Sequence, residues 1–118
     1  MSTAQRGAAA EAQAQRHLEA QGLKLLARNW RCAGGELDLV MREGATLVMV
    51  EVRQRSRSDY GDAFESVHAR KRAHLAHAAR LFLAAHPEHA GRPVRFDVVA
   101  VDGAGGLEWR PAAFEAED

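Results

Sequence analysis

The chain has 118 residues, the usual size of one domain with one packed core. Its 16 basic and 16 acidic residues balance to a formal charge of zero, and a single cysteine excludes an internal disulfide and a cysteine-rich zinc site. No apolar run approaches the roughly 20 residues of a membrane span, so we expect a cytoplasmic protein with no membrane partner.

The first elements are a helix and a strand. Residues 8–21 are rich in alanine and are followed by Gly22, which is typical of a helix that ends in a glycine cap. Ser2 and Gln5 have the spacing of a capping box ahead of it. Residues 23–30 mix apolar and basic side chains and predict the first strand.

A β-hairpin is expected next. Residues 35–42 and 45–53 are two apolar runs, and only Glu43 and Gly44 separate them. Two such runs around a short glycine-containing turn are typical of antiparallel strands.

The second half of the chain predicts a loop, a helix and two strands. Residues 55–62 are polar and contain glycine, which favours a loop, and apolar residues recur at helical spacing over 67–85. Pro87 is expected to end that helix. A valine-rich buried strand is predicted over 94–101, and a short edge strand over 107–110.

The hairpin gathers carboxylates on one face. A turn at Glu43 and Gly44 would oppose Glu36 to Glu51 and Asp38 to Met49, and side chains alternate between the two faces of a strand. The three carboxylates then share one face, while the apolar residues of the other face form core. Asp38 and Glu51 become diagonal neighbours with backbones about 7 Å apart. Because like charges repel, something cationic must offset them.

Two kinds of cation fit this patch. Arg53 and other arginines would make a cross-strand salt-bridge network. A hard divalent cation, Mg²⁺ or Mn²⁺, would instead bind the carboxylates and keep several waters for chemistry. Glu11 lies three residues before Ala14 and seven before Leu18, so it points along the inner stripe of the first helix. It is either a further metal ligand or a surface glutamate near the helix start.

Basic residues are concentrated in the middle of this neutral chain. They follow the hairpin and begin the second helix, where they would either contact phosphates or form a solvated face. These candidate nucleic-acid-binding residues are Arg55, Arg57, Arg70, Lys71 and Arg72.

Asp97 stands in an otherwise apolar strand, between Phe96 and Val98. A buried acidic residue needs a partner. We expect a backbone or arginine hydrogen bond there and no catalytic role.

Several of these segments together resemble the bacterial YraN-like family. They are GELDL at 35–39, VMVEVR at 48–53, RFDVV at 95–99, and two supporting segments, Ala10-Glu11 and RNWR at 28–31. The likeness covers almost the whole chain. That family is similar to the restriction-endonuclease-like PD-D/ExK nucleases, and particularly to archaeal-type Holliday junction resolvases.

The resemblance implies an α/β fold with a restriction-endonuclease-like α-β-β-β-α-β core, in which helices flank a mixed central sheet. It is expected to form a single nuclease-like domain over residues 1–118. The ends, roughly residues 1–6 and 112–118, are expected to be flexible.

The resemblance also assigns the site. It implies Glu11, Asp38 and Glu51 as ligands of Mg²⁺ or Mn²⁺, and Asp38, Glu51 and Arg53 as the catalytic group. Arg53 stands where the Glu-x-Lys motif of those nucleases has lysine. Because arginine stays protonated at any accessible pH, Arg53 cannot act as a general base but can stabilise charge on a phosphate.

Three functions follow as hypotheses. The first is a metal-dependent endonuclease that hydrolyses phosphodiester bonds in DNA, with branched or flapped structures as candidate substrates. The second is a non-catalytic module that binds nucleic acid or a partner on the same fold. The third is a structural subunit that forms a homodimer through its last strands.

Overall fold

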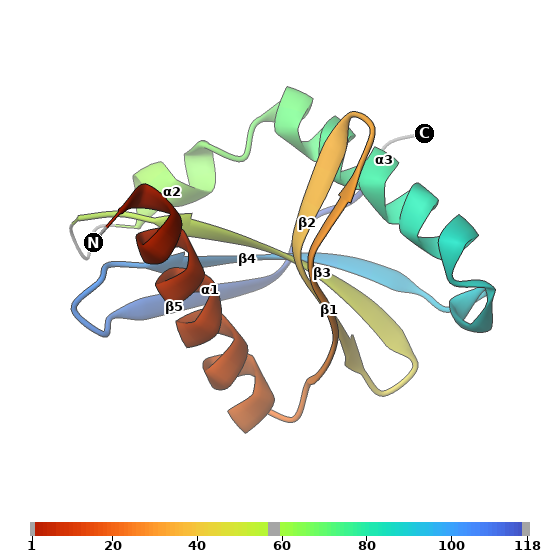
Figure 1. Cartoon of the computed structure of the whole chain (residues 1–118), viewed down its shortest axis with the longest axis horizontal. Coiled ribbons are helices and arrows are strands. Elements are labelled where there is room, and N and C mark those ends of the chain that lie inside the picture. Colours follow the sequence, from red (N-terminus) through yellow and green to blue (C-terminus); the bar gives the residue numbers. More distant parts are fainter. Residues whose placement is uncertain (1, 57–59, 117–118) are drawn as a thin grey trace.

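The computed structural model describes residues 2–56 and 60–116, which form a mixed α/β fold around one five-stranded sheet (Figure 1). Strands β1 to β5 follow one another across the sheet in chain order; β3 and β4 are parallel and the other neighbours are antiparallel. The elements are α1 (Thr3–Ala20), β1 (Lys24–Cys32), β2 (Gly35–Glu43), β3 (Thr46–Gln54), α2 (Gly61–Glu65), α3 (Ala69–Ala85), a short 3₁₀ turn (Pro87–His89), β4 (Val94–Val101) and β5 (Leu107–Phe114). The expected helix-flanked mixed sheet is confirmed.

Helix α1 begins earlier than residue 8, the predicted start, because its capping box is formed. The Ser2 hydroxyl accepts a hydrogen bond from the Gln5 amide at 3.1 Å, and the Gln5 side chain accepts one from the Ser2 amide at 2.7 Å. These bonds satisfy amide donors that a helix start otherwise leaves unpaired. The helix therefore begins at Thr3, within the segment 1–6 that was expected to be flexible.

The predicted register of the hairpin was wrong by two residues. Glu43 pairs with Thr46 and Val40 with Met49, so the turn consists of Gly44 and Ala45. Gly44 has φ of 58° and occupies the first of the two turn positions, the place that a type II′ turn reserves for glycine. Because the shift is even, Asp38 and Glu51 keep the same parity as in the predicted pairing.

Both faces of the hairpin are buried, whereas only one was expected to be core. Val40 and Met49 lie under α3, and Leu39 and Val50 lie under α1. Figure 1 shows the two long helices on opposite sides of the sheet. None of the helices in the described part of the chain is both long and apolar enough to cross a membrane.

The second half differs from the expectation at three element boundaries. A short helix, α2, begins at Gly61 within the predicted loop. Helix α3 begins at Ala69, not at residue 67, because the His68 side chain caps it by accepting the Lys71 amide at 3.4 Å. Strand β5 continues past Pro111 to Phe114, with Ala112 at φ of 50° where the pairing with β4 shifts register.

Asp97 is fully buried on β4 and joins the last two strands. The Arg95 guanidinium donates to both of its oxygens, at 2.9 and 3.0 Å. The Trp109 indole donates at 2.9 Å and the Ala112 amide at 3.0 Å. Arg95 also reaches Glu43 at 2.7 Å, which ties the hairpin to this network. The expected arginine and backbone partners of Asp97 are confirmed.

Candidate functional site

The central sheet splits between β2 and β3. Their backbone pairing runs from Glu43 opposite Thr46 as far as Leu39 opposite Val50. Beyond that pair, an Asp38 carboxylate oxygen accepts the Val52 amide at 2.9 Å in place of a backbone carbonyl. Strand β2 then continues beside β1 and strand β3 beside β4, so the strands diverge (Figure 1). We call this place, with Asp38 on one branch and Glu51 on the other, the fork.

Glu51 is buried at the fork with only one of its oxygens satisfied. Its side chain is 5% exposed, and Oε2 is 3.1 Å from the Arg53 guanidinium and 3.4 Å from the Lys71 ammonium. Oε1 is buried and has no hydrogen-bond partner within the described residues. An unpaired buried carboxylate oxygen is costly unless something binds it.

The protonation of Glu51 reflects this environment. Burial is the largest cause and the neighbouring Asp38 carboxyl group adds to it; together they raise the pKa of Glu51 to about 8, against the opposing effect of Lys71 and Arg53. Burial next to a second carboxyl group thus disfavours the charged form of Glu51.

Glu11 lies beside Asp38 on the α1 side of the fork. Burial raises the pKa of Glu11, the charge of Asp38 adds to the rise, and a hydrogen bond to the Asn29 side chain opposes it. Within residues 2–56 and 60–116, however, no three His, Cys, Asp or Glu side chains are grouped closely enough to hold a metal ion. The structure thus brings Asp38 and Glu51 together and places Glu11 at their flank.

Glu36, expected on the same patch as Asp38 and Glu51, turns toward β1. Its carboxylate is 3.5 Å from Arg31, and the side chains of this pair are 79% exposed for Arg31 and 38% for Glu36. The patch therefore consists of two carboxylates, with Glu36 on its outer side.

The three consecutive basic residues at the start of α3 point in different directions. Lys71 reaches inward to Glu51, whereas Arg70 is exposed. Arg72 bonds back to the Val67 carbonyl at 2.9 Å. Of the predicted phosphate contacts, Lys71 thus lies in the fork itself.

The other two predicted phosphate contacts follow β3. Arg55 is held by the Asp62 carboxylate at 3.1 Å and by the Gln54 carbonyl at 2.6 Å. Arg57 lies outside the described residues.

Sequence reasoning missed two functional contacts. It predicted that Lys71 contacts DNA and did not predict its ion pair with Glu51. The approach of α3 to β3 is a tertiary contact, which sequence periodicity does not encode. It also missed Asn29, which has φ of 49° opposite the Asp38 branch and bonds Glu11. The tolerance of asparagine for positive φ was the available signal.

The donor set at the fork fits a magnesium-like ion. Mg²⁺ is usually bound by one or two carboxylates and keeps several waters, so it needs no cage of protein ligands. Oε1 of Glu51 and the Asp38 carboxylate supply two such groups, and Glu11 lies close enough to Asp38 for the charge of Asp38 to raise its pKa. Arg53 contacts Oε2 and leaves Oε1 free.

Comparison with known proteins identifies relatives of this chain. Residues 10–101 match the model of the uncharacterised protein family UPF0102. A UPF0102 protein of Pseudomonas entomophila is 53% identical over 92% of both chains. One of Stutzerimonas stutzeri is 52% identical over 93% of this chain and 94% of its own. The resemblance to an uncharacterised bacterial family is confirmed, and the chain belongs to UPF0102.

Proposed function

We propose that this protein is a divalent-metal-dependent nuclease that hydrolyses phosphodiester bonds in DNA at the fork. One observation carries the proposal: a buried glutamate, Glu51, has an unpartnered oxygen beside a second carboxylate, Asp38. Such a pair is destabilising in the protein alone and is relieved by a cation that binds both groups.

Each residue of the fork has a role in this proposal. Asp38 and Glu51 hold the Mg²⁺ or Mn²⁺ ion, with Glu11 at its flank. The bound ion would supply an activated water and polarise the scissile phosphate. Arg53 and Lys71, both already on Glu51, stabilise negative charge that develops on the phosphate.

A nucleic-acid substrate agrees with the charges around the fork. Lys71 and Arg53 are partly exposed, with 31% and 26% of their side chains accessible, and the exposed Arg70 lies beside Lys71 in sequence. These cations offer phosphate contacts without a high overall charge. The resemblance to Holliday junction resolvases makes branched and flapped DNA the first substrates to test.

Cleavage assays test the proposal directly. The protein, E51Q and D38N are incubated with branched, flapped, duplex and single-stranded DNA plus Mg²⁺, Mn²⁺ or EDTA. We expect metal-dependent cleavage by the unaltered protein and a loss of about 10³-fold in both variants, the size typical of a removed catalytic group. E88Q is the matched control, because Glu88 is exposed and lies in the 3₁₀ turn after α3, where it takes no part in the fork. Equal cleavage by E51Q would refute the proposal.

A second candidate function has its own observation. Arg53 and Lys71 already neutralise Oε2 of Glu51, so two cations of the chain itself support the fork. The same surface would then bind DNA without cutting it. Calorimetric titration with Mn²⁺ separates the two candidates: DNA binding with no metal binding would favour the non-catalytic module.

A further inference from the structure

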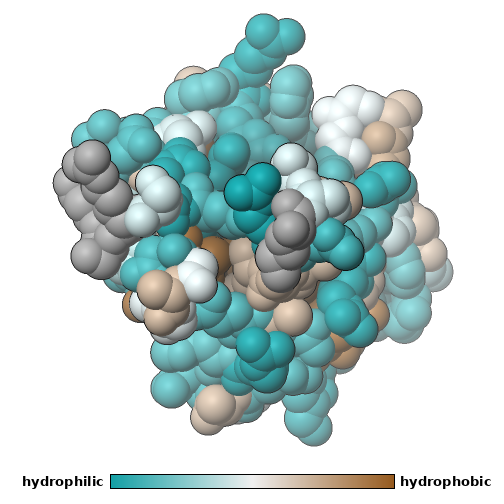
Figure 2. Space-filling view, turned by 60° about the vertical axis from the view of Figure 1, so that its left-hand side comes forward, coloured by the Kyte–Doolittle hydropathy of each residue, from teal (hydrophilic) through white to brown (hydrophobic). Residues whose placement is uncertain are grey.

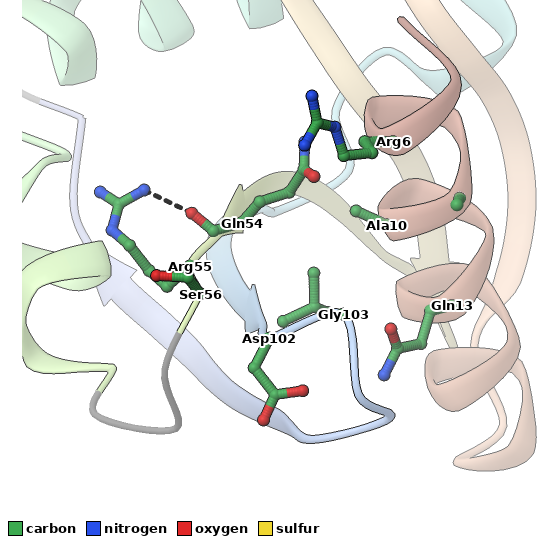
Figure 3. Close-up of a pocket in the computed structure, with 10 residues that line it drawn as sticks. Arg6, Ala10, Gln13, Gln54, Arg55, Ser56, Asp102 and Gly103 are labelled. Atoms are coloured by element: carbon green, nitrogen blue, oxygen red, sulfur yellow. Dashed lines mark hydrogen bonds between the residues drawn. The ribbon is translucent and has the colours of Figure 1, made fainter. Parts of the chain in front are cut away.

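A pocket of about 460 Å³ lies outside the carboxyl ends of the parallel strands β3 and β4. Figure 2, which brings this side of the molecule forward, shows an apolar patch recessed in a largely polar surface. Arg6 and Gln13 line the pocket from α1, Gln54 and Arg55 from the end of β3, and Gly103 from the turn after β4. Figure 3 shows the Arg55 side chain directed away from α1. We call it the carboxyl-end pocket.

The pocket combines an apolar lining with cationic and amide groups. Ala9, Ala10 and Val101 contribute small apolar side chains. Of its two guanidinium groups, that of Arg55 is engaged by Asp62 and by the Gln54 carbonyl. The Arg6 guanidinium is exposed and makes no hydrogen bond or ion pair within the described ranges. Arg6 is therefore available to an anion.

The far rim of the pocket is held rigid. One Asp102 oxygen accepts the Ala104 and Gly106 amides at 2.8 and 2.9 Å, and the other accepts the Tyr60 hydroxyl at 3.0 Å. The Gln13 side chain donates to the Gly106 carbonyl at 3.4 Å and joins this rim to α1. Both Asp102 oxygens are thus occupied, and a ligand would meet a wall that is already ordered.

The pocket and the fork are neighbours along β3. Gln54 follows Glu51 by three residues, a span of about 10 Å at the rise of a strand. The odd separation places the two side chains on opposite faces, with Gln54 on the α1 side. A nucleic-acid strand that passes the fork and bends around the end of β3 would reach the pocket within a few nucleotides.

We propose that the carboxyl-end pocket binds one nucleotide of the nucleic-acid strand that the fork cuts, an inference that rests on the proposed function. The Arg6 guanidinium takes the phosphate, and the sugar and base lie on the alanine and valine lining. The Gln13 and Gln54 amides face the base edge. The volume suits a ligand of this size, and a crevice at the carboxyl ends of parallel strands is where α/β proteins commonly bind nucleotides.

Amide chemical-shift mapping tests the pocket without any cleavage. The full chain, labelled with ¹⁵N and kept in EDTA, is titrated with thymidine 5′-monophosphate, with thymidine and with inorganic phosphate. We expect the monophosphate to shift the resonances of Ala9, Ala10 and Gly103 at lower concentration than either fragment. Equal shifts with inorganic phosphate would reduce the pocket to an anion site, and no shifts at these residues would overturn the proposal.

Three variants give the residue-level test. R6Q removes the free cation and A9L fills the pocket from the exposed face of α1; both should weaken monophosphate binding at least fivefold. R16Q, an exposed arginine of the same helix outside the pocket, should leave it unchanged. Equal binding by all three variants would refute the assignment.

The same variants separate this proposal from the proposed function. If the fork cuts DNA, R6Q should raise KM and leave kcat within twofold, whereas E51Q removes cleavage and still binds the monophosphate. Cleavage without monophosphate binding would overturn the pocket alone. Monophosphate binding with no cleavage of any DNA would overturn the nuclease and leave a nucleotide-binding pocket.

Discussion

Two acidic residues are buried on adjacent strands of this sheet, and they differ in how many of their hydrogen-bonding positions are filled. Asp97 on β4 is fully buried and accepts four hydrogen bonds, from Arg95, Trp109 and Ala112. Glu51 on β3 is 4% exposed, and one of its oxygens has no hydrogen-bond partner within residues 2–56 and 60–116. Both oxygens of the first carboxylate are bonded within the protein, whereas Oε1 of the second has no hydrogen-bond partner in the described part of the chain.

Asp97, a structural acid, and Glu51, the acid that we propose to be functional, thus differ in their hydrogen-bond partners and not in their burial. A satisfied buried network rigidifies a fold, whereas a half-satisfied one costs stability and is retained where a ligand uses it. Local composition is similar at the two positions, because each residue precedes a valine in a buried strand. The sequence distinguished them through the position of Glu51 beside Asp38 on the hairpin and through the family resemblance.

The largest expected effect is at Asp97. D97N keeps the size of the side chain but turns an amide toward the donors of Arg95 and Trp109, so it should lower the free energy of unfolding by about 3–5 kcal/mol. Urea denaturation monitored by Trp fluorescence measures it. The exposed D62N change should cost under about 0.5 kcal/mol. If D97N cost no more stability than D62N, the Asp97 network would not be a structural one.

Neutralising Glu51, whose Oε1 atom has no partner in the described residues, should raise the free energy of unfolding, whereas D97N lowers it. Because the pKa of Glu51 in the folded state, about 8, lies above its ordinary value of 4.5, the folded state holds the Glu51 proton more tightly than the unfolded state does, and stability falls as pH rises through that window. E51Q removes this titration. We expect E51Q to exceed the original protein by about 2 kcal/mol at pH 9 and to lose that advantage toward pH 5.

Urea midpoints of both proteins at pH 5, 7 and 9 give the difference. A difference that is constant across this range would show that Glu51 does not carry the raised pKa.

Lys71 should contribute more than its neighbours in sequence. K71Q removes a cation 3.4 Å from Glu51, so kcat should fall about tenfold, or about 1.4 kcal/mol, and the pH profile should move upward as the pKa of Glu51 rises further. R70Q, which alters the exposed neighbour, should change only salt-dependent DNA binding. Identical pH profiles for K71Q and R70Q would remove Lys71 from the fork.

The smallest effect is expected at Arg53. R53K restores lysine at this position and keeps a cation near Oε2 of Glu51, so the unfolding free energy should change by under about 1 kcal/mol. Cleavage should stay within a few-fold of the original or rise. A complete loss of cleavage in R53K would mean that the planar guanidinium is indispensable, which the single contact at 3.1 Å does not suggest.

Local patterns predicted most of the fold, and long-range contacts account for the differences. The valines of β4 and the alanines of α1 indicated their elements because burial imposes strand or helix periodicity. The hairpin register depends on whether Gly44 takes the first or the second position of the two-residue turn. The alternation of apolar and polar residues fits both registers, because they differ by two residues. Parity placed Asp38 beside Glu51, but the opening of the strands, the approach of Lys71 and the pairing of Glu36 with Arg31 arise only when the elements pack.

The most direct test of the account is a crystal of the protein grown or soaked with Mn²⁺ and measured for anomalous scattering. We predict a single strong peak at the fork, within about 2.0–2.3 Å of the Glu51 Oε1 atom and an Asp38 oxygen. No peak at saturating Mn²⁺, with Oε1 of Glu51 bonded instead to another group of the protein, would contradict it.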